Sequence, residues 1–394
     1  MKYENDFPML NNDFIYFDNA ATTFKPKEVI EKIKEYYEKY NCNIHRGSYD
    51  LSFRTSDKFE ESRIAVQKFI NAKSKNEIIF TSGTTDSLNM IINGFFSYYL
   101  KDNDEVLLSI SEHASNVLPW INLSKRKKIF LKYIDLDENN KININNLLDK
   151  ISSNTRVISL AYITNVIGDV RNIKEICKKA RERNILVVVD GAQSVGHIIT
   201  DVQDIDCDFF AFSAHKMYGP EGVGVLYGKD KYVQKMIPTT FGGGMNKMFN
   251  TNDLTLSYVP QRFEAGTLNI GNVIAFKSAI NYIYNIGMNN INRKEYHLRL
   301  YLVSELSKIP YITIHNEFSE GPIILITAKN IESSNLGLYL NSKKICTRSG
   351  SHCAKLLKDD FSNTLRISLA FYNTYEEIDY LLDQLRNKKN LYNF

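Results

Sequence analysis

Two patterns of apolar and polar residues alternate along the first two-thirds of the chain. Short, almost wholly apolar runs bounded by turn residues predict buried strands, at 77–81, 106–109, 129–134, 157–163, 184–190 and 208–213. Segments with apolar residues three or four positions apart predict amphipathic helices, at 26–40, 55–70, 86–100, 143–151 and 173–183. Strands separated by helices indicate an α/β fold, in which a mostly parallel sheet is covered by helices on both faces.

The pattern changes from about residue 260 onward, where longer helices precede short strands. Helices are predicted at 272–286, 292–307 and 376–385, and strands at 312–315, 323–327 and 364–369. This second pattern indicates a separate α+β unit. We therefore expect a large sheet domain over residues 21–265, and a smaller C-terminal domain over residues 266–394 that also takes in residues 1–20.

Two of the predicted strands lead into residues whose side chains can take part in a reaction. The strand at 208–213 runs into Ser213-Ala214-His215-Lys216, and partial desolvation at a strand end would make the Lys216 amine a nucleophile for carbonyl groups. The alternative is a solvated lysine in a tight turn. The strand at 184–190 ends in Asp190, where open α/β sheets place ligand contacts. Such a pair is what pyridoxal phosphate needs, since the lysine can form a Schiff base and the carboxylate can keep the pyridine nitrogen protonated.

At a third strand end, the segment Ser82-Gly83-Thr84-Thr85 connects the predicted strand at 77–81 to the predicted helix that follows it. Free backbone N–H groups and small hydroxyls at a helix start form an anion site, which would suit a phosphate. A simple helix cap by threonine is the alternative. Because His113, Asn165, Asp190 and Lys216 also follow strand ends, we expect them to meet this junction at one rim of the sheet.

Composition narrows the classes of function. The 394 residues are 43% hydrophobic, and the net charge of +4 is spread along the chain without a basic block, so no nucleic-acid partner is expected. Five cysteines without a Cys-x-x-Cys pair argue against a disulfide framework or a zinc ribbon and suit a reducing compartment. We see no cluster of metal ligands. The absence of a signal-peptide core and of a long apolar run predicts a cytoplasmic protein without a membrane span.

An ordered set of motifs over nearly the whole chain resembles the class V, fold-type I pyridoxal phosphate enzymes, and among them the cysteine desulfurases. The central motifs are Asp190-Gly191-Ala192-Gln193 and Ser213-Ala214-His215-Lys216. The others are Asp18-Asn19-Ala20-Ala21, Asn43-Ile44-His45-Arg46-Gly47, Thr81-Ser82-Gly83-Thr84-Thr85, Glu112-His113, Thr164-Asn165-Val166-Ile167-Gly168, Phe241-Gly242-Gly243-Gly244, Arg262-Phe263-Glu264-Ala265-Gly266-Thr267, Arg348-Ser349-Gly350-Ser351-His352-Cys353 and Leu365-Arg366-Ile367-Ser368.

The resemblance implies conversion of L-cysteine into L-alanine and an enzyme-bound persulfide. It implies three catalytic residues: Lys216 as Schiff-base lysine and base, His113 as a ring stacked on the pyridine that relays protons, and Cys353 as the nucleophile toward sulfur. Residues implied to hold the cofactor are Lys216, Asp190, Gln193, Thr84, Thr85, His113, Ser213, His215 and Thr267. Residues implied to hold the substrate are Asn165, Arg366, Arg348, Ala20 and His45. Thr267 is expected to reach the cofactor of the partner in a homodimer.

The choice of Cys353 over Cys346 can be argued from the residues. Cys346 follows Lys344-Ile345 in a predicted strand, where a buried thiol would be inert. Cys353 follows Gly350-Ser351-His352, which predicts an exposed, flexible loop carried by the small domain. We expect Arg348, His352 and Lys355 to favour the Cys353 thiolate.

The segment around Cys353 resembles the group II, SUF-type branch, which implies a SUF-type sulfur-acceptor protein as partner. Two departures weaken that assignment: Ser351 stands where many members have a second histidine, and Leu268 stands where Gly-Thr-Pro is usual. Iron–sulfur clusters are the expected destination of the sulfur, with tRNA thiolation as the alternative. Rival functions are a selenocysteine lyase, a class V aminotransferase or kynureninase relative, and a non-catalytic sulfur-transfer scaffold.

Overall fold

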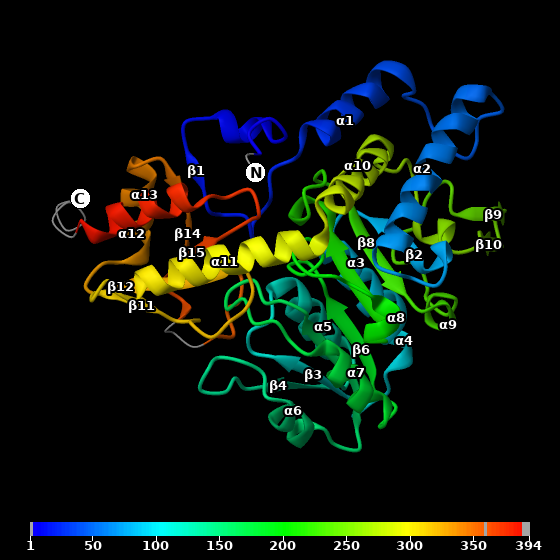
Figure 1. The fold of residues 1–394 in the computed structure, drawn as a ribbon. Coiled ribbons are helices and arrows are strands. Elements are labelled where there is room, and N and C mark those ends of the chain that lie inside the picture. Colours follow the sequence, from blue (N-terminus) through cyan, green and yellow to red (C-terminus); the bar gives the residue numbers. More distant parts are fainter. Residues whose placement is uncertain (1–2, 358–360, 388–394) are drawn as a thin grey trace.

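The structure is a computed structural model that describes residues 3–357 and 361–387. Its centre is a seven-stranded sheet in the order β2-β8-β7-β6-β5-β3-β4 (Figure 1). The strands are β2 (Ile78–Thr81), β3 (Glu105–Ser109), β4 (Phe130–Ile134), β5 (Thr155–Ala161), β6 (Leu186–Asp190), β7 (Phe209–Ser213) and β8 (Gly224–Gly228). Strand β8 runs antiparallel to the other six strands of this sheet, which all point in the same direction. The expected α/β class with a mostly parallel sheet is confirmed.

Helices cover both faces of this sheet, because its central strands are apolar on both sides. Phe210 and Phe212 of β7 face one core, while Phe209 and Ala211 face the other, as the two-residue period of a strand requires. The first core is closed by α1 (Lys27–Lys39), α2 (Asp50–Phe69), α6 (Ile144–Lys150), α7 (Ile173–Arg181) and α10 (Ile270–Ile286). The second is closed by α3 (Thr84–Ile91), a π-helical turn (Ile92–Phe96) and α5 (Ala114–Arg126).

A second unit forms around a four-stranded antiparallel sheet in the order β11-β12-β15-β14. These strands are β11 (Ile312–Ile314), β12 (Ile323–Ala328), β14 (Arg348–Gly350) and β15 (Thr364–Ser368). The helices packed on it are α11 (Met288–Leu306), α12 (Ser333–Ser342) and α13 (Tyr375–Arg386). The N-terminal segment joins this unit, since β1 (Ile15–Tyr16) pairs with β13 (Ile345–Cys346) and Phe17 lies in its core.

Helix α10 packs in a different place from the one the sequence pattern suggests. It was expected in the small domain, yet it lies against α1 and α2 in the core of the large sheet. Chain direction changes at Gly287, a residue with φ of +86° that separates α10 from α11. We therefore propose that the boundary between the two domains lies near residue 287 rather than residue 265.

The remaining elements are short. They are α4 (Ser97–Tyr99), α8 (Val202–Ile205), α9 (Asp230–Val233) and the β9 (Asn246–Phe249)–β10 (Leu254–Leu256) hairpin, with single 3₁₀ turns at Pro8–Asn11, Lys75–Glu77, Ala214–Lys216 and Gln261–Phe263. Across residues 3–357 and 361–387, none of the helices has the length and apolar character needed to cross a bilayer.

Candidate active site

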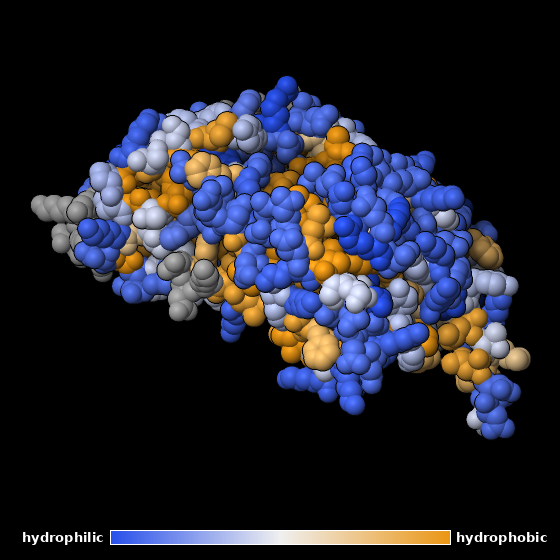
Figure 2. Space-filling view, turned by 90° about the horizontal axis from the view of Figure 1, so that it is seen from below, coloured by the Kyte–Doolittle hydropathy of each residue, from blue (hydrophilic) through white to orange (hydrophobic). Residues whose placement is uncertain are grey.

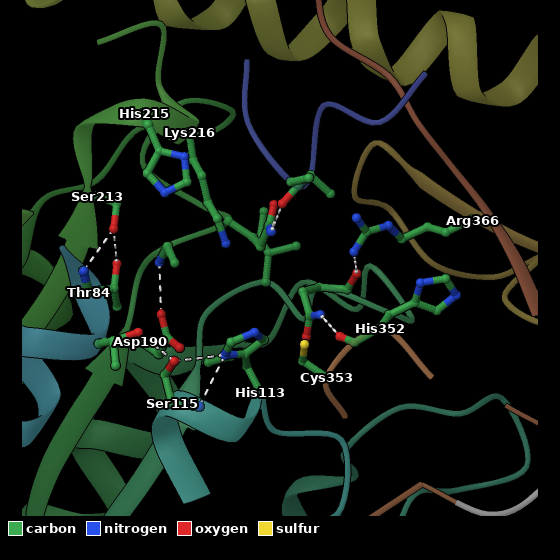
Figure 3. Close-up of a pocket in the computed structure, with 18 of the residues that line it drawn as sticks. Thr84, His113, Ser115, Asp190, Ser213, His215, Lys216, His352, Cys353 and Arg366 are labelled. Atoms are coloured by element: carbon green, nitrogen blue, oxygen red, sulfur yellow. Dashed lines mark hydrogen bonds between the residues drawn. The ribbon is translucent and has the colours of Figure 1, made fainter. Parts of the chain in front are cut away.

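A cavity of about 280 Å³ lies between the two domains, where several strands of the large sheet end (Figure 3). It brings together thirteen of the residues singled out in the sequence: Ala20, Thr84, Thr85, His113, Asn165, Asp190, Gln193, Ser213, His215, Lys216, Arg348, Cys353 and Arg366. Two others, His45 and Thr267, do not line it. Residues predicted to be functional therefore line one cavity, and they come from both domains.

Lys216 lies at the end of the single 3₁₀ turn that follows β7. The turn is held in place because the N–H of Thr23 donates to the His215 carbonyl at 3.0 Å and the N–H of Ala214 donates to the Val223 carbonyl at 3.0 Å. Burial lowers the pKa of the Lys216 amine to about 8, although the nearby Asp190 carboxylate opposes the shift. With this pKa, roughly a tenth of the amine is neutral and nucleophilic at pH 7, far more than for a solvated lysine.

Asp190 ends β6 and lies on the same cavity wall. Its Oδ1 accepts a hydrogen bond from the Ala192 N–H at 2.9 Å, and burial raises the pKa of the carboxyl group. A buried carboxylate is stabilised by a cationic partner, such as the protonated ring nitrogen of a pyridine. Gln193 follows closely and is oriented by its own hydrogen bond, in which Nε2 donates to the Ala20 carbonyl at 2.8 Å.

The start of α3 forms a polar corner opposite Asp190. The Thr84 N–H donates to Ser213 Oγ at 2.7 Å, and the Thr84 and Ser213 hydroxyls lie 2.6 Å apart. Backbones approach closely here, because a Cβ on Gly224 would lie 2.4 Å from the Gly83 Cα. The first-turn N–H groups of α3, which lack a partner within the helix, and the hydroxyls of this corner suit a phosphate.

His113 caps α5, and its ring is fixed by Ser115. The Ser115 N–H donates to His113 Nδ1 at 3.1 Å, and the Ser115 hydroxyl lies 3.0 Å from the same nitrogen. Burial, reinforced by the charges of Lys216 and Arg366, lowers the pKa of His113 to about 4. The ring is therefore neutral at neutral pH, and because Nδ1 is an acceptor, the proton sits on Nε2.

Ser115 was missed in the sequence. Besides orienting His113, its hydroxyl lies 2.7 Å from that of Thr85, so it joins the histidine to the polar corner at α3. Its position two residues after His113 of the Glu112-His113 motif was the one signal available. Glu112 itself points away from the cavity into a buried network, pairing with Arg171 and accepting a hydrogen bond from Asn116 at 2.7 Å.

Arg366 projects from β15 and is almost fully buried. Its two terminal nitrogens donate to the Asn165 carbonyl and to Asp18 Oδ1, each at 2.9 Å, while Arg348 Nε lies 3.4 Å from the other Asp18 oxygen. Asp18 thus holds two arginines at the cavity. The sequence motif contained Asp18, but nothing in the motif indicated this pairing.

Among the residues that the structure describes, three buried polar atoms beside this arginine pair find no hydrogen-bond partner: Arg366 Nε, Asn165 Oδ1 and His352 Nδ1. Unpaired buried polar atoms are rare in folded proteins and indicate a missing polar partner. A donor and an acceptor so placed suit the carboxylate and amine of an amino acid. With the Lys216 amine, the Asp190 carboxylate and the polar corner at α3, the cavity fits pyridoxal phosphate together with an amino-acid substrate.

Cys353 is exposed at the mouth of the cavity, as expected. Its backbone is tied at two points, because Asn165 Nδ2 donates to the His352 carbonyl at 2.6 Å and the Ala114 N–H donates to the Cys353 carbonyl at 2.9 Å. His352 and Cys353 both adopt left-handed conformations, with φ of +51° and +64°. Two consecutive non-glycine residues in this region indicate a strained turn held by its surroundings.

The expectation that His352 favours the Cys353 thiolate is wrong. His352 was expected to favour it by positive charge, but burial and the Arg366 charge lower the pKa of His352 to about 3. The ring is neutral and adds no charge, so Arg348 and Arg366 supply the positive field at this end of the cavity. Cys346, on β13, is half-buried, and burial together with the Asp18 charge raises the pKa of its thiol.

His45 and Thr267 lie in two neighbouring hollows rather than in the cavity. Thr267 lies beside Thr81 and Ser82, and His45 lies beside Gly244 and Gly266. The segment before Thr267 is anchored by Glu264, whose carboxylate accepts from both terminal nitrogens of the buried Arg63 at 2.7 and 2.8 Å. The cofactor role of Thr267 and the substrate role of His45 stay predictions, because neither residue lines the cavity.

Comparison with known proteins places this geometry in a family. The model of the class-V aminotransferase family matches residues 15–381. A probable cysteine desulfurase of Borreliella burgdorferi is 40% identical over 95% of this chain and 92% of its own length. A cysteine desulfurase of Wigglesworthia glossinidia brevipalpis is 38% identical over 97% of this chain and 95% of its own length.

Solved structures agree with the sequence relatives. The apo structure of a cysteine desulfurase from Thermococcus onnurineus NA1 has a TM-score of 0.94 and 33% identity, and it covers 98% of this chain and 96% of that one. The similarity spans both domains, including the cavity between them. The chain therefore belongs to the class-V aminotransferase family of pyridoxal phosphate enzymes, among relatives that are cysteine desulfurases.

Proposed function

We propose that this chain is a pyridoxal phosphate-dependent cysteine desulfurase, which converts L-cysteine into L-alanine and leaves the sulfur as a persulfide on Cys353. The observation that carries the proposal is that Lys216 and Cys353 line the same cavity, one from each domain. A transaminase needs the lysine but has no use for an exposed thiol at the mouth of its site. The sequence relatives support the same activity.

The residues of the cavity divide the binding between two ligands. Thr84, Thr85, Ser213 and His215 would hold the cofactor phosphate, Asp190 would pair with its ring nitrogen and Gln193 with its ring hydroxyl oxygen. Pyridoxal phosphate, when bound, supplies an aldehyde for amines and a ring that accepts electrons from the substrate Cα. Arg366 and Asn165 would hold the substrate carboxylate, with Arg348 and Ala20 bordering it.

Proton movements are assigned to two groups with lowered pKa values. The Lys216 amine, with a pKa of about 8, would take the proton from the substrate Cα and return it later. His113 is neutral with its proton on Nε2, so it can donate that proton or a hydrogen bond without first being charged. Ser115 would keep the ring in this tautomer.

Sulfur transfer is assigned to Cys353. Its thiolate would attack the substrate sulfur and form an S–S bond while the Cβ–S bond of the substrate breaks. The electron pair of that bond passes to the carbon side, and Cβ then takes a proton, so the carbon product is alanine. The left-handed turn at His352 and Cys353, held by Asn165 and Ala114, would present the sulfur toward the cavity.

The activity is tested by incubating the purified holoenzyme with L-cysteine and measuring alanine and sulfide, with and without a reductant. We expect equal amounts of alanine and sulfide with reductant, and protein-bound sulfur without it. Amino transfer from cysteine to a keto acid, or a protein without cysteine turnover, would contradict the proposal. Selenocysteine as the sole substrate would support a selenocysteine lyase in its place.

Replacement of Arg366 by alanine should mainly raise the KM for cysteine. Loss of a guanidinium that binds a desolvated carboxylate costs about 2–4 kcal/mol, or roughly thirty- to thousand-fold in kcat/KM. Arg366→Lys keeps a cation beside Asp18 but loses the planar guanidinium group. Its kcat/KM should therefore lie between that of Arg366→Ala and that of the wild type. Steady-state kinetics measure the effect, and an unchanged kcat/KM in Arg366→Ala would remove Arg366 from the substrate site.

We further propose a homodimer in which Thr267 reaches the cofactor phosphate of the partner. Apolar patches interrupt the polar surface on the face seen in Figure 2, and Met248, Phe249 and Leu254 of the β9–β10 hairpin are exposed. Thr267→Ala should weaken retention of pyridoxal phosphate on dialysis, because one hydrogen bond to the phosphate is lost, while the sedimentation coefficient stays that of a dimer. A fully active monomer in sedimentation velocity would overturn this assignment.

The persulfide on Cys353 needs an acceptor. We propose a sulfur-acceptor protein of SUF type in the cytoplasm, with iron–sulfur cluster assembly as the destination. The exposure of Cys353 supports transfer to a protein partner, because a buried persulfide could not be reached.

A further inference from the structure

A buried carboxylate outside the catalytic cavity connects the three segments on which the proposed chemistry depends. It belongs to Glu295, on the side of α11 that faces the large domain, and it is 2% exposed. Helix α11 begins beside the large sheet and runs across into the small domain (Figure 1). Charged side chains are seldom this buried unless they are paired, so the contacts of Glu295 need a structural explanation.

Glu295 contacts three different parts of the chain. Its Oε2 lies 2.8 Å from His197 Nδ1, and its Oε1 accepts from the Tyr218 hydroxyl at 3.4 Å. Burial raises the pKa of the Glu295 carboxyl group, and the backbone N–H of Phe371 opposes this rise by stabilising the charged form. His197 and Tyr218 are themselves buried, with exposed fractions of 3% and 0%.

Each of these partners lies in the segment that follows a strand with a residue of the cavity on it. His197 lies after β6, which ends in Asp190, and Tyr218 lies two residues after Lys216. Phe371 follows β15, which carries Arg366. One carboxylate therefore links the segments after Asp190, Lys216 and Arg366, and Arg366 is the one that comes from the other domain.

Packing around Glu295 strengthens this link. The rings of Tyr218 and Phe371 meet edge to face with centroids 4.9 Å apart. Next to His197, a Cβ on Gly196 would lie 3.0 Å from the Lys216 carbonyl, so the segment after β6 rests on the backbone of the Lys216 turn. Displacement of any one segment would be transmitted to the other two.

We propose that Glu295 is a positioning residue that sets Arg366 relative to Lys216 and Asp190. It touches neither substrate nor cofactor, and it acts by holding the small-domain strand of Arg366 against the large-domain segments. The substrate carboxylate and Cα are then presented at a fixed separation from the Lys216 amine, which is the geometric requirement for proton abstraction. The inference rests on the proposed roles of Lys216 and Arg366 in cysteine desulfuration.

Glu295→Gln tests the proposal at nearly constant side-chain volume. A glutamine keeps one acceptor oxygen but presents an NH₂ group to neighbours that are themselves donors, so at least one of the three links is lost. We expect about a tenfold fall in kcat/KM for cysteine, carried mainly by KM. Glu305→Gln, which changes a carboxylate of α11 that forms surface ion pairs with Lys308 and Arg386, is the matched control and should behave as the wild type.

A double-mutant cycle separates positioning from general destabilisation. If Glu295 acts through Arg366, then Glu295→Gln in an Arg366→Lys background should change kcat/KM by less than about twofold. Tyr218→Phe removes one of the links and keeps the ring packing, so it replaces Glu295→Gln in the cycle if that variant fails to fold.

The outcomes distinguish the inference from the function on which it rests. An equal fall in both backgrounds, or an unchanged kcat/KM in a folded Glu295→Gln or Tyr218→Phe protein, would overturn the positioning role. A wild-type enzyme without cysteine turnover would instead overturn the proposed function. A loss of thermal stability with unchanged KM would mean that the Glu295 links are structural only.

Discussion

Replacement of Lys216 by alanine is expected to abolish turnover of cysteine and the covalent attachment of the cofactor. The structure gives the physical reason, since Lys216 is the amine with a pKa lowered to about 8 in the cavity that also holds Asp190 and the polar corner at α3. Loss of a positioned acid–base group alone costs about 10²–10⁴-fold in rate. Absorbance spectra of the dialysed protein and alanine formation measure the two effects.

The same absorbance spectra are recorded for a control variant, and they can also contradict the role of Lys216. Lys231→Ala removes an exposed lysine of α9 and should keep both the yellow absorbance and full turnover. A Lys216→Ala protein that still shows a yellow, borohydride-reducible band after dialysis would mean that another lysine binds the cofactor.

Replacement of Cys353 by alanine is expected to leave cofactor binding intact and to abolish turnover of cysteine. The thiol lies at the mouth of the cavity, opposite the groups assigned to the cofactor, so its loss removes the sulfur acceptor without disturbing the phosphate or ring contacts. Selenocysteine should keep part of its turnover, because selenolate is a better leaving group than thiolate. Visible spectra and alanine assays with both substrates test these expectations.

Cys346→Ala is the matched control for this variant. The Cys346 thiol is half-buried on β13, its pKa is raised by burial, and it does not line the cavity. The control should turn over cysteine as the wild type does. Full turnover in Cys353→Ala, or loss of turnover in Cys346→Ala alone, would reverse the assignment of the nucleophile.

Much of the large domain could be predicted from the sequence because its strands are buried on both faces. In β7 (Phe209–Ser213) the first four residues are all apolar, and the polar and turn residues on either side mark the ends of the run. Strand β8 was missed because the glycines at 222, 224 and 228 resemble a loop. The close approach of backbones to Gly83 is what requires the glycine at 224. Helix α5 was missed because Pro119 lies inside it.

The candidate site was predictable where chemistry follows a strand end. Lys216, Asp190 and His113 satisfy that rule, and the structure brings all three to one cavity. Contacts between distant segments were not predictable, because no local pattern encodes them. The pairing of Asp18 with Arg366 and the hydrogen bond from Asn165 to the His352 carbonyl join residues 348 and 187 positions apart.

The protonation state of His352 shows the same limit more sharply. In the sequence a histidine next to a cysteine suggests a charge that favours the thiolate. In the structure the ring is buried beside Arg366, and its pKa falls to about 3. The sequence thus predicted that the histidine lies next to the cysteine, but burial and the neighbouring Arg366 charge decided its protonation state.

Persulfide formation on Cys353 is tested most directly by following the sulfur atom itself. Wild-type holoenzyme is incubated with isotopically labelled L-cysteine in the absence of reductant, the thiols are alkylated, and the peptides are analysed by mass spectrometry. We expect one added labelled sulfur on the peptide that contains Cys353, with alanine formed in equal amount. Label on the peptide of Cys346, or alanine formation without any protein-bound sulfur, would contradict it.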